Sequence, residues 1–251
     1  DVEHVEQAGC APIADELSAI ASAADKAALA RLLGALQRVG VKGAVMAYVD
    51  TDAKNSERYL LHWTQSGLGL PDESYYREEK FAGIRAEYAA HMARMFALAG
   101  LDDQCEQVLA VEAALAAGHW DVVRRRDANL SYNLRSVDSI RTDEPGFDWA
   151  QWLAGMGVEP GQAGEVIVRQ PSYLSVFAAA WSELPLSSWQ AWLSWHLLRA
   201  RAQYLSSAFV DESFAFTGTT MSGTERNRER WQRGVALVQE LLGEAVGKLY
   251  V

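Results

Sequence analysis

The histidines are the first residues to test for metal chemistry, because imidazole is the commonest metal ligand in proteins. No two of them are three or four residues apart, so none forms the paired ligands that a helix of a zinc protease presents. The two cysteines, Cys10 and Cys105, are far apart and form no C-x-x-C pair. We therefore predict no metal ligand in this chain. The five histidines are His4, His62, His91, His119 and His196.

One carboxylate stands on an apolar helical stripe, where it needs polar partners. Glu112 lies three residues before Leu115 on that stripe. It could act as a general base with a raised pKa. It could equally be half of a structural ion pair, with Arg124, Arg125 or Arg126 as the cation. We favour the ion pair, because guanidinium groups pair well with buried carboxylates.

Other catalytic signatures are absent from the sequence. No G-x-S-x-G elbow occurs, and the serines fall mostly at helix starts. His91 and His196 lie on apolar helical faces and could be buried bases, but ordinary core histidines with satisfied ring nitrogens are favoured. The G-x-G at Gly67 and Gly69 lacks the third glycine of a dinucleotide site and the lysine of a P-loop, so it is read as a turn. We predict no catalytic residue.

Charge limits the possible partners. Lys and Arg number 23 and Asp and Glu number 33, which gives a net charge of −10. A nucleic-acid site needs a basic stripe, and an anionic membrane surface also attracts basic segments, so both partners are disfavoured. The run Arg124–Arg126 could still hold a small anion. No apolar run approaches the ~20 residues of a membrane-spanning helix.

Helical periodicity dominates the chain and would position these residues. Apolar residues recur at three-and-four spacing, most regularly over residues 81–99. Capping boxes are predicted at Ser187 with Gln190 and at Ser222 with Glu225. A last helix passes through Trp231, and sequence signals end it at Gly243. The other main predicted helices span residues 25–39, 102–117, 147–156, 171–181 and 187–204.

Residues 44–65 have a different pattern, in which two alternating extended runs flank a polar turn. This pattern predicts a β-hairpin, expected to be the only substantial strand pair, with a brief extended piece at residues 166–168. The predicted fold class is therefore mainly α, a multi-helix domain with one small β-hairpin.

Several motifs, taken in order, resemble the neprilysin-like (endothelin-converting-enzyme-like) zinc metallopeptidases. The hairpin and the G-L-G-L-P loop followed by Tyr75 and Tyr76 carry the resemblance most clearly. Histidine stands at position 196, where that family often has arginine. The further matching segments are residues 109–116 with Glu112, Asp127 with Tyr132 and Asn133, and residues 168–174, 192–195, 218–220, 230–231 and 245–251.

The resemblance implies that residues 1–251 form the helical lid of a two-lobed protease. In that family a zinc-bearing lobe hydrolyses peptide bonds, and the lid closes a chamber that admits peptides. Its zinc motif would lie beyond the equivalent of Val251, so zinc is expected in the full-length parent and no catalytic residue is transferred to this chain. The implied partners are the catalytic lobe of the same polypeptide and, in the parent, peptide substrates. Glu112, Arg124, Arg125, Arg126, Tyr132 and Asn133 are kept as structural candidates.

Two alternatives remain open. The chain could be a free-standing helical binding or scaffold module without protease activity, or an unrelated hydrolase that uses Glu112 or a histidine. The lack of a disulfide framework favours a bacterial, reducing, cytoplasmic setting.

Overall fold

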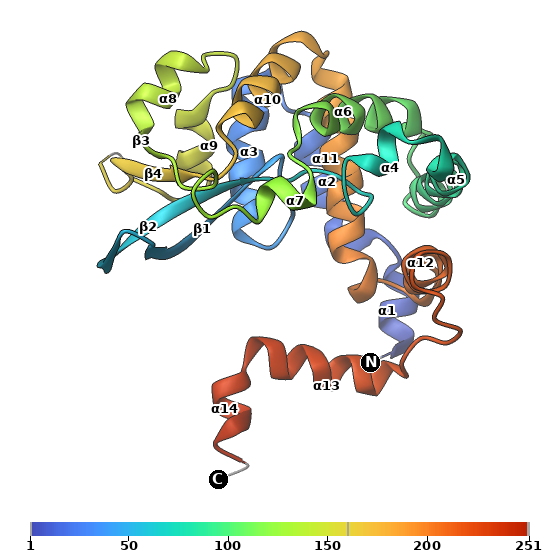
Figure 1. Ribbon diagram of the computed structural model, residues 1–251. Coiled ribbons are helices and arrows are strands. Elements are labelled where there is room, and N and C mark those ends of the chain that lie inside the picture. Colours follow the sequence, from blue (N-terminus) through green and yellow to red (C-terminus); the bar gives the residue numbers. More distant parts are fainter. Residues whose placement is uncertain (1, 160, 250–251) are drawn as a thin grey trace.

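The structure is a computed structural model that describes residues 2–159 and 161–249. Helices form most of this part of the chain, and a small sheet lies along one side of the helical body (Figure 1). None of the described helices is long and apolar enough to cross a membrane. The mainly α fold class is thus confirmed. The helices are α1 (Val2–Ala8), η1 (Ala11–Ile13), α2 (Ala14–Ala21), α3 (Lys26–Arg38), α4 (Ser74–Arg77), η2 (Glu79–Phe81), α5 (Ala82–Leu98), α6 (Cys105–Gly118), α7 (Val122–Arg125), α8 (Val137–Asp143), α9 (Trp149–Gly155), α10 (Pro171–Glu183), α11 (Leu186–Arg201), η3 (Ala202–Tyr204), α12 (Ser207–Phe214), η4 (Ala215–Thr220), α13 (Arg230–Leu241) and α14 (Gly243–Gly247).

Helix α11 is the centre of the core. It contacts α2, α3, α5 and α6, and its middle part is buried without interruption from Ala191 to Leu198. A helix that is apolar on all sides is expected inside a protein rather than on its surface. Its three tryptophans, Trp189, Trp192 and Trp195, are fully buried, and Trp189 continues the ring contacts through Trp181 into α10.

The hairpin belongs to a four-stranded sheet with the order β1-β2-β4-β3. Strands β1 (Val45–Asp52) and β2 (Asn55–Gln65) are antiparallel, as predicted, with a tighter turn than the polar cluster suggested. The expectation that they would be the only substantial strand pair is wrong. Strand β4 (Glu165–Val168) pairs parallel with β2, and β3 (Leu134–Ser136) pairs antiparallel with β4. Both added strands are short, and strands of three or four residues carry little alternation in sequence.

Glycines allow α3 and α9 to pack closely. A Cβ at Gly34 would lie 2.1 Å from the carbonyl oxygen of Trp152, and one at Gly155 would lie 1.9 Å from that of Arg31. Only hydrogen fits at such distances, so the two helices meet backbone to backbone. This contact brings Trp152 and Trp149 of α9 onto Trp63 of the sheet.

The two predicted capping boxes are wrong. Helix α11 begins after Pro185, and the Gln190 amide donates instead to the carbonyl oxygens of Ile20 and Ala21 at the end of α2. The Ser222 hydroxyl donates to the Thr217 carbonyl, and the box at α13 forms from Glu229 and Gln232. A tertiary contact thus engages the Gln190 amide, and a bond back to η4 engages the Ser222 hydroxyl.

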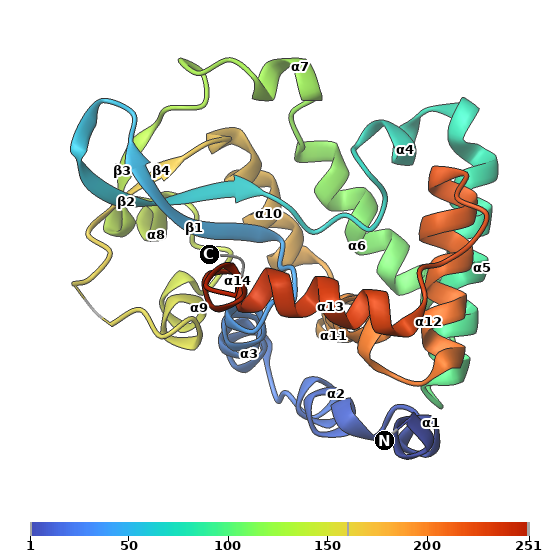
Figure 2. The same ribbon diagram turned by 90° about the horizontal axis from the view of Figure 1, so that it is seen from below.

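Helices α13 and α14 lie below the body and apart from it in Figure 1. In Figure 2, which is seen from below, they cross in front of it. The apolar stripe predicted from Trp231 onwards is present, but α13 has no buried residue. Trp231 is 68% exposed and Leu242 is 58% exposed. The Gly243 signal also acts as expected, because α13 ends just before it and α14 begins there. An amphipathic helix with an uncovered apolar face is incomplete as a packing unit.

Candidate functional site

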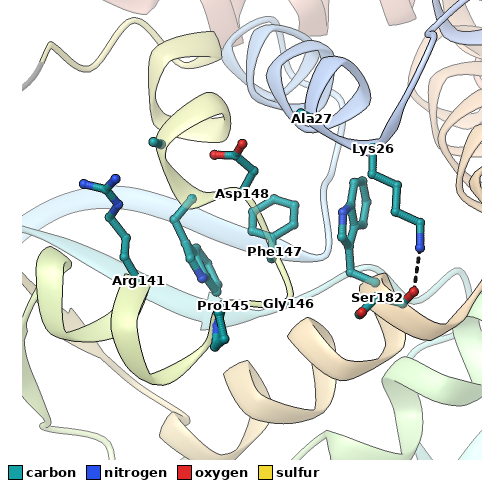
Figure 3. A pocket seen from close by; sticks show the side chains of 11 residues that line it. Lys26, Ala27, Arg141, Pro145, Gly146, Phe147, Asp148 and Ser182 are labelled. Carbon is teal, nitrogen blue, oxygen red and sulfur yellow. Dashed lines mark hydrogen bonds between the residues drawn. The ribbon is translucent and has the colours of Figure 1, made fainter.

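One surface groove of about 450 Å³ lies between the starts of α3 and α9 (Figure 3). Its polar groups are already engaged within the protein. Lys26 Nζ donates to the Ser182 carbonyl oxygen at 2.7 Å, and the Asp148 carboxylate accepts from the Gln151 N–H. Arg141 lies 3.5 Å from Asp138. This groove therefore presents no group poised for chemistry.

A second cavity, of about 400 Å³, combines cations with apolar walls and is called the basic pocket below. The loop at residues 67–72 forms one side of it. Segment η4, a π-helix, supplies another side with Phe216 and Thr217. π-Helical turns are rare and occur often at functional sites. The remaining residues of the basic pocket are Lys42, Gln65, Ser66, His119, Arg125, Arg199 and Met221.

The loop of the basic pocket is held from behind by a buried carboxylate. Tyr76 accepts hydrogen bonds from the Gly69 and Leu70 N–H groups at 3.1 and 3.0 Å, and its hydroxyl donates to Glu112 Oε2 at 2.7 Å. Only glycine fits at position 69, because a Cβ there would lie 1.6 Å from the hydroxyl of Tyr88, which also contacts Glu112. Glu112 of α6 thus fixes the loop backbone through Tyr76.

Glu112 is fully buried, and its predicted arginine partner is wrong. Its carboxylate accepts from the hydroxyls of Tyr76 and Tyr88, the latter at 3.0 Å. His196 Nε2 lies 3.3 Å from Oε1, within ion-pair distance but too poorly aligned for a hydrogen bond. The three arginines instead follow α6 on the exposed segment around α7. The tyrosines that bind Glu112 belong to segments already noted in the sequence, the Tyr75-Tyr76 pair and the helix with Tyr88. Their spacing along the chain does not show that they contact Glu112.

Burial shapes the protonation of this cluster. Desolvation, reinforced by the Glu112 charge, raises the pKa of Tyr76 and Tyr88 well above the usual value, so both hydroxyls stay protonated and donate. Desolvation lowers the pKa of His196, which favours its neutral form. The Tyr88 hydroxyl also accepts from Trp195 Nε1 at 2.6 Å. The cluster is thereby a hydrogen-bonded support for the loop at residues 67–72.

Two further histidines have structural partners. His91 Nδ1 lies 2.7 Å from Glu212 Oε1, and Arg94 holds the second oxygen of Glu212 at 2.8 Å, which joins α5 to α12. His119 Nε2 donates to the Ser66 carbonyl at 3.1 Å. Desolvation lowers the pKa of His119 to about 4, and Arg125 adds to the shift. His119 lines the basic pocket and His91 lines a neighbouring cavity, but the ring nitrogens named here are engaged in these contacts.

The arginine run divides between two surroundings. The Arg124 guanidinium stacks 3.8 Å above the Trp120 ring, whereas Arg125 lines the basic pocket. Arg126 is exposed. Of this run, only Arg125 is placed to hold an anion in the basic pocket. Lys42 and Arg199 line the same pocket, which their positions in the sequence did not indicate.

Tyr132 and Asn133 tie the sheet together. The Tyr132 hydroxyl donates to Asp52 Oδ1 at 2.9 Å, beside the β1–β2 turn. The Asn133 amide donates to the Leu130 and Val168 carbonyls, and its own carbonyl accepts from the Val168 N–H. Asp52 is fully buried, and the Lys54 N–H, with Arg58 and Tyr132, lowers its pKa to about 2. Tyr132 and Asn133 therefore hold strands of the sheet in register.

Zinc does not fit the described residues. Among positions 2–159 and 161–249, no group of three or more His, Cys, Asp or Glu side chains could hold a metal ion. The pairs His91–Glu212 and His196–Glu112 supply two ligands each and are occupied by hydrogen bonds to arginine or tyrosine. No chemical step is therefore assigned to a metal on this chain.

Comparison with solved structures gives a close match over all of this chain. The zinc metalloprotease Zmp1 of Mycobacterium tuberculosis in its open state has 50% sequence identity and a TM-score of 0.96, with 100% of this chain and 40% of Zmp1 covered. An inhibitor complex of Zmp1 gives a TM-score of 0.97 and covers 39% of that protein. PepO of Lactobacillus rhamnosis, at 19% identity and a TM-score of 0.80, shares the fold and has 40% of its length covered.

Curated relatives agree with the structural match. Endothelin-converting enzyme 1 of guinea pig (Cavia porcellus) is 28% identical over 216 residues, which cover 81% of this chain and 28% of that enzyme. The human enzyme is 28% identical over 214 residues with the same coverage. The chain thus spans less than a third of the endothelin-converting enzymes that it matches. The family profile described as peptidase family M13, in its N-terminal part, matches residues 1–251. The chain belongs to the neprilysin-like metallopeptidases of peptidase family M13.

Proposed function

We propose that this chain is the helical lid of a zinc metalloendopeptidase and that it restricts access to the active-site chamber without cutting peptides itself. In this proposal a second lobe of the same polypeptide binds zinc, which polarises the scissile carbonyl and activates water. The lid excludes bulk water and large substrates from that chamber. The observation that carries the proposal is the agreement with Zmp1 along the whole of this chain, which corresponds to 40% of Zmp1.

The uncovered face of α13 supports a further lobe. Trp231, Val235, Val238, Leu241 and Leu242 are exposed to between 46% and 69%, on a helix that lies apart from the body. Large exposed apolar patches mark interaction sites in proteins that fold properly. A lobe encoded in the same polypeptide would cover this stripe at no cost in translational freedom. The stripe is therefore a candidate contact with the catalytic lobe.

The absence of catalytic groups in the described residues gives the lid role its test. The purified 251-residue chain should neither bind zinc at one ion per chain nor hydrolyse a fluorogenic peptide, whereas the longer polypeptide that carries it should do both. Metal content by mass spectrometry and peptide hydrolysis are measured on the same preparations. Stoichiometric zinc and hydrolysis by the 251-residue chain would refute the proposal.

A free-standing helical binding module is the second candidate, and the exposed stripe of α13 also favours it, because a separate partner could cover the stripe. Reading the coding sequence past Val251 separates the two. An H-E-x-x-H motif downstream supports the lid, because two histidines four apart and a glutamate form the zinc site of such proteases. A stop codon supports the module.

A further inference from the structure

We propose that the basic pocket binds the side-chain carboxylate of an acidic residue in a peptide, and so gives the protease a preference for acidic peptides. This inference rests on the proposed lid function for its consequence in catalysis. The binding itself is a property of this chain and can be measured without zinc or a catalytic lobe.

The charge of the basic pocket is opposite to that of the molecule. The chain carries a net charge of −10, yet Lys42, Arg125 and Arg199 all line this one cavity. None of the three forms an ion pair with a carboxylate in residues 2–159 or 161–249 of the structure. Cations held at one cavity without counter-ions attract an anion more strongly than isolated surface charges do.

The negative groups near the basic pocket do not cancel this excess. Asp72 is the acidic residue that lines it, and its Oδ1 accepts from the N–H and the hydroxyl of Ser74. Glu112 lies behind the loop, where the Tyr76 and Tyr88 hydroxyls occupy its oxygens. Three cations against these two carboxylates leave a positive balance on the open side. His119 donates to Ser66 and adds no charge at neutral pH, since its pKa is about 4.

The walls suit a carboxylate on an aliphatic stem. Leu68, Phe216 and Met221 line the basic pocket beside the cations, so methylene groups have apolar contacts while the charged end meets guanidinium and ammonium groups. Its volume of about 400 Å³ is within the range of about 300–1,000 Å³ that is usual for small-ligand sites. Arginine in particular matches the planar carboxylate with paired N–H donors.

The loop that forms one wall of the basic pocket is held by hydrogen bonds before any ligand arrives. Gly67 has a φ of +93°, a backbone conformation that residues with a side chain rarely adopt. Its carbonyl accepts a hydrogen bond from Trp192 Nε1 at 3.0 Å. The Gly69 and Leu70 N–H groups are held by Tyr76. A preformed wall reduces the ordering cost of binding.

Elements that line the basic pocket lie on the side of the body where the catalytic lobe of the proposed protease would contact α13. Figure 1 places α7 and the segment between β2 and α4 on the side of the body that faces α13, and Figure 2 views that side. A neighbouring cavity, lined by His91 and His196, shares Lys42, Arg199 and Thr217 with the basic pocket. Lys42 and Arg199 therefore border two adjacent cavities.

The test compares two labelled peptides that differ by one Glu→Gln change, with the N-terminus acetylated and the C-terminus amidated so that the side chain is the sole carboxylate. Their binding to the 251-residue chain is measured by fluorescence anisotropy at low salt. We expect the glutamate peptide to bind about tenfold more tightly, the effect of a charge meeting more than one cation, and the difference to shrink as salt rises above about 0.1 M.

Matched arginine variants locate the site. Arg125→Gln should weaken the glutamate peptide about threefold, the size of a partly exposed ion pair, and should leave the glutamine peptide unchanged. Arg124→Gln removes the same charge one residue away, on a side chain that stacks on Trp120 outside the basic pocket, and should have no such effect. Lys42→Gln should behave like Arg125→Gln.

Three results would overturn the inference. These are equal binding of the two peptides, equal losses from Arg124→Gln and Arg125→Gln, and displacement of both peptides by inorganic phosphate with no glutamate preference. Each concerns binding to this chain alone. None bears on whether the longer polypeptide excludes large substrates, so failure of this inference is distinguishable from failure of the lid proposal.

Discussion

At the scale of single residues, Glu112 illustrates how a buried carboxylate is accommodated without a neighbouring guanidinium. Two tyrosine hydroxyls donate to it, and His196 lies 3.3 Å away. Hydrogen bonds to a charged group contribute more than those between neutral groups. The stability of the 67–72 loop should therefore depend on hydroxyls rather than on a salt bridge.

Removing the Tyr76 hydroxyl tests this arrangement. Tyr76→Phe leaves the Gly69 and Leu70 N–H groups and one Glu112 oxygen without their partner, so the free energy of unfolding should fall by about 1–3 kcal/mol. Tyr75→Phe is the matched control, because the Tyr75 ring stacks on Phe81 and its hydroxyl is not part of the cluster. Urea unfolding followed by circular dichroism measures both. Equal stability of the two variants would contradict the proposed role of the hydroxyl.

The half-buried His119 predicts that acid destabilises the fold. Its pKa is about 4 in the folded chain and about 6.5 when unfolded, so between these values the unfolded state binds a proton that the folded state does not. The free energy of unfolding should fall with decreasing pH over that window, by about 2 kcal/mol from this residue between pH 7 and pH 5. His119→Gln keeps a donor for Ser66 and should flatten the dependence. An NMR titration with a midpoint near pH 6.5 would contradict the account.

The sequence located most of these residues but not their partners. The stripe position of Glu112 correctly indicated a buried carboxylate, and the apolar positions of His91 and His196 correctly indicated core histidines. The expectation that the ring nitrogens are satisfied is wrong for His196, because its Nε2 has no hydrogen-bond partner. The partners come from Tyr76 and Tyr88, 36 and 24 residues away along the chain. Local spacing encodes which face of a helix is buried, whereas contacts between distant segments depend on how the helices are placed.

At the scale of elements, glycine sets the contact between α3 and α9. Gly34→Ala would place a methyl group 2.1 Å from the Trp152 carbonyl, so the helices must separate, and the expected loss is about 1–3 kcal/mol. Gly234→Ala makes the same change on exposed α13 with nothing within 4 Å, and helix propensity predicts a gain of about 0.5–1 kcal/mol. Thermal unfolding of both variants measures whether Gly34→Ala lowers stability while Gly234→Ala raises it. A stable Gly34→Ala protein would mean that this contact adjusts easily.

Helix α13 should respond differently in the short and long chains. Trp231→Arg should change the unfolding free energy of the 251-residue chain by less than about 0.5 kcal/mol, because Trp231 is 68% exposed. In the longer polypeptide the loss should reach about 3 kcal/mol, if the catalytic lobe buries the indole. Gln239→Arg adds the same charge at an exposed position of the same helix and should be neutral in both. Equal effects of Trp231→Arg in both chains would argue against an interlobe contact.

Most helices and the hairpin could be predicted from sequence, because the spacing of apolar residues in a long periodic segment indicates which face is buried. The brief extended piece predicted at residues 166–168 is present as β4, but its pairing with β2 and the existence of β3 could not be predicted, since these strands are short and are stabilised by pairing with distant segments. The capping boxes failed for a related reason. Gln190 had a tertiary acceptor at the end of α2, and nothing in its local sequence distinguishes that from a cap.

At the scale of the whole molecule, two features fit one account. The described residues offer no cluster for a metal, and they present an uncovered apolar helix beside a body that matches part of a larger protease. As the proposed lid, this chain would act on catalysis by shape, through the substrates that it admits. The proposed carboxylate site in the basic pocket would add a preference in charge to that selection.

The measurement that tests access most directly uses one cleavable sequence in two settings. It is offered to the longer polypeptide as a short free peptide and as a linker between two folded domains, with an unrelated open-cleft protease to show that both are accessible. The account predicts hydrolysis of the free peptide and an intact linker, because the closed chamber admits only the peptide. Comparable kcat/KM values for the two substrates would contradict the lid role of this chain.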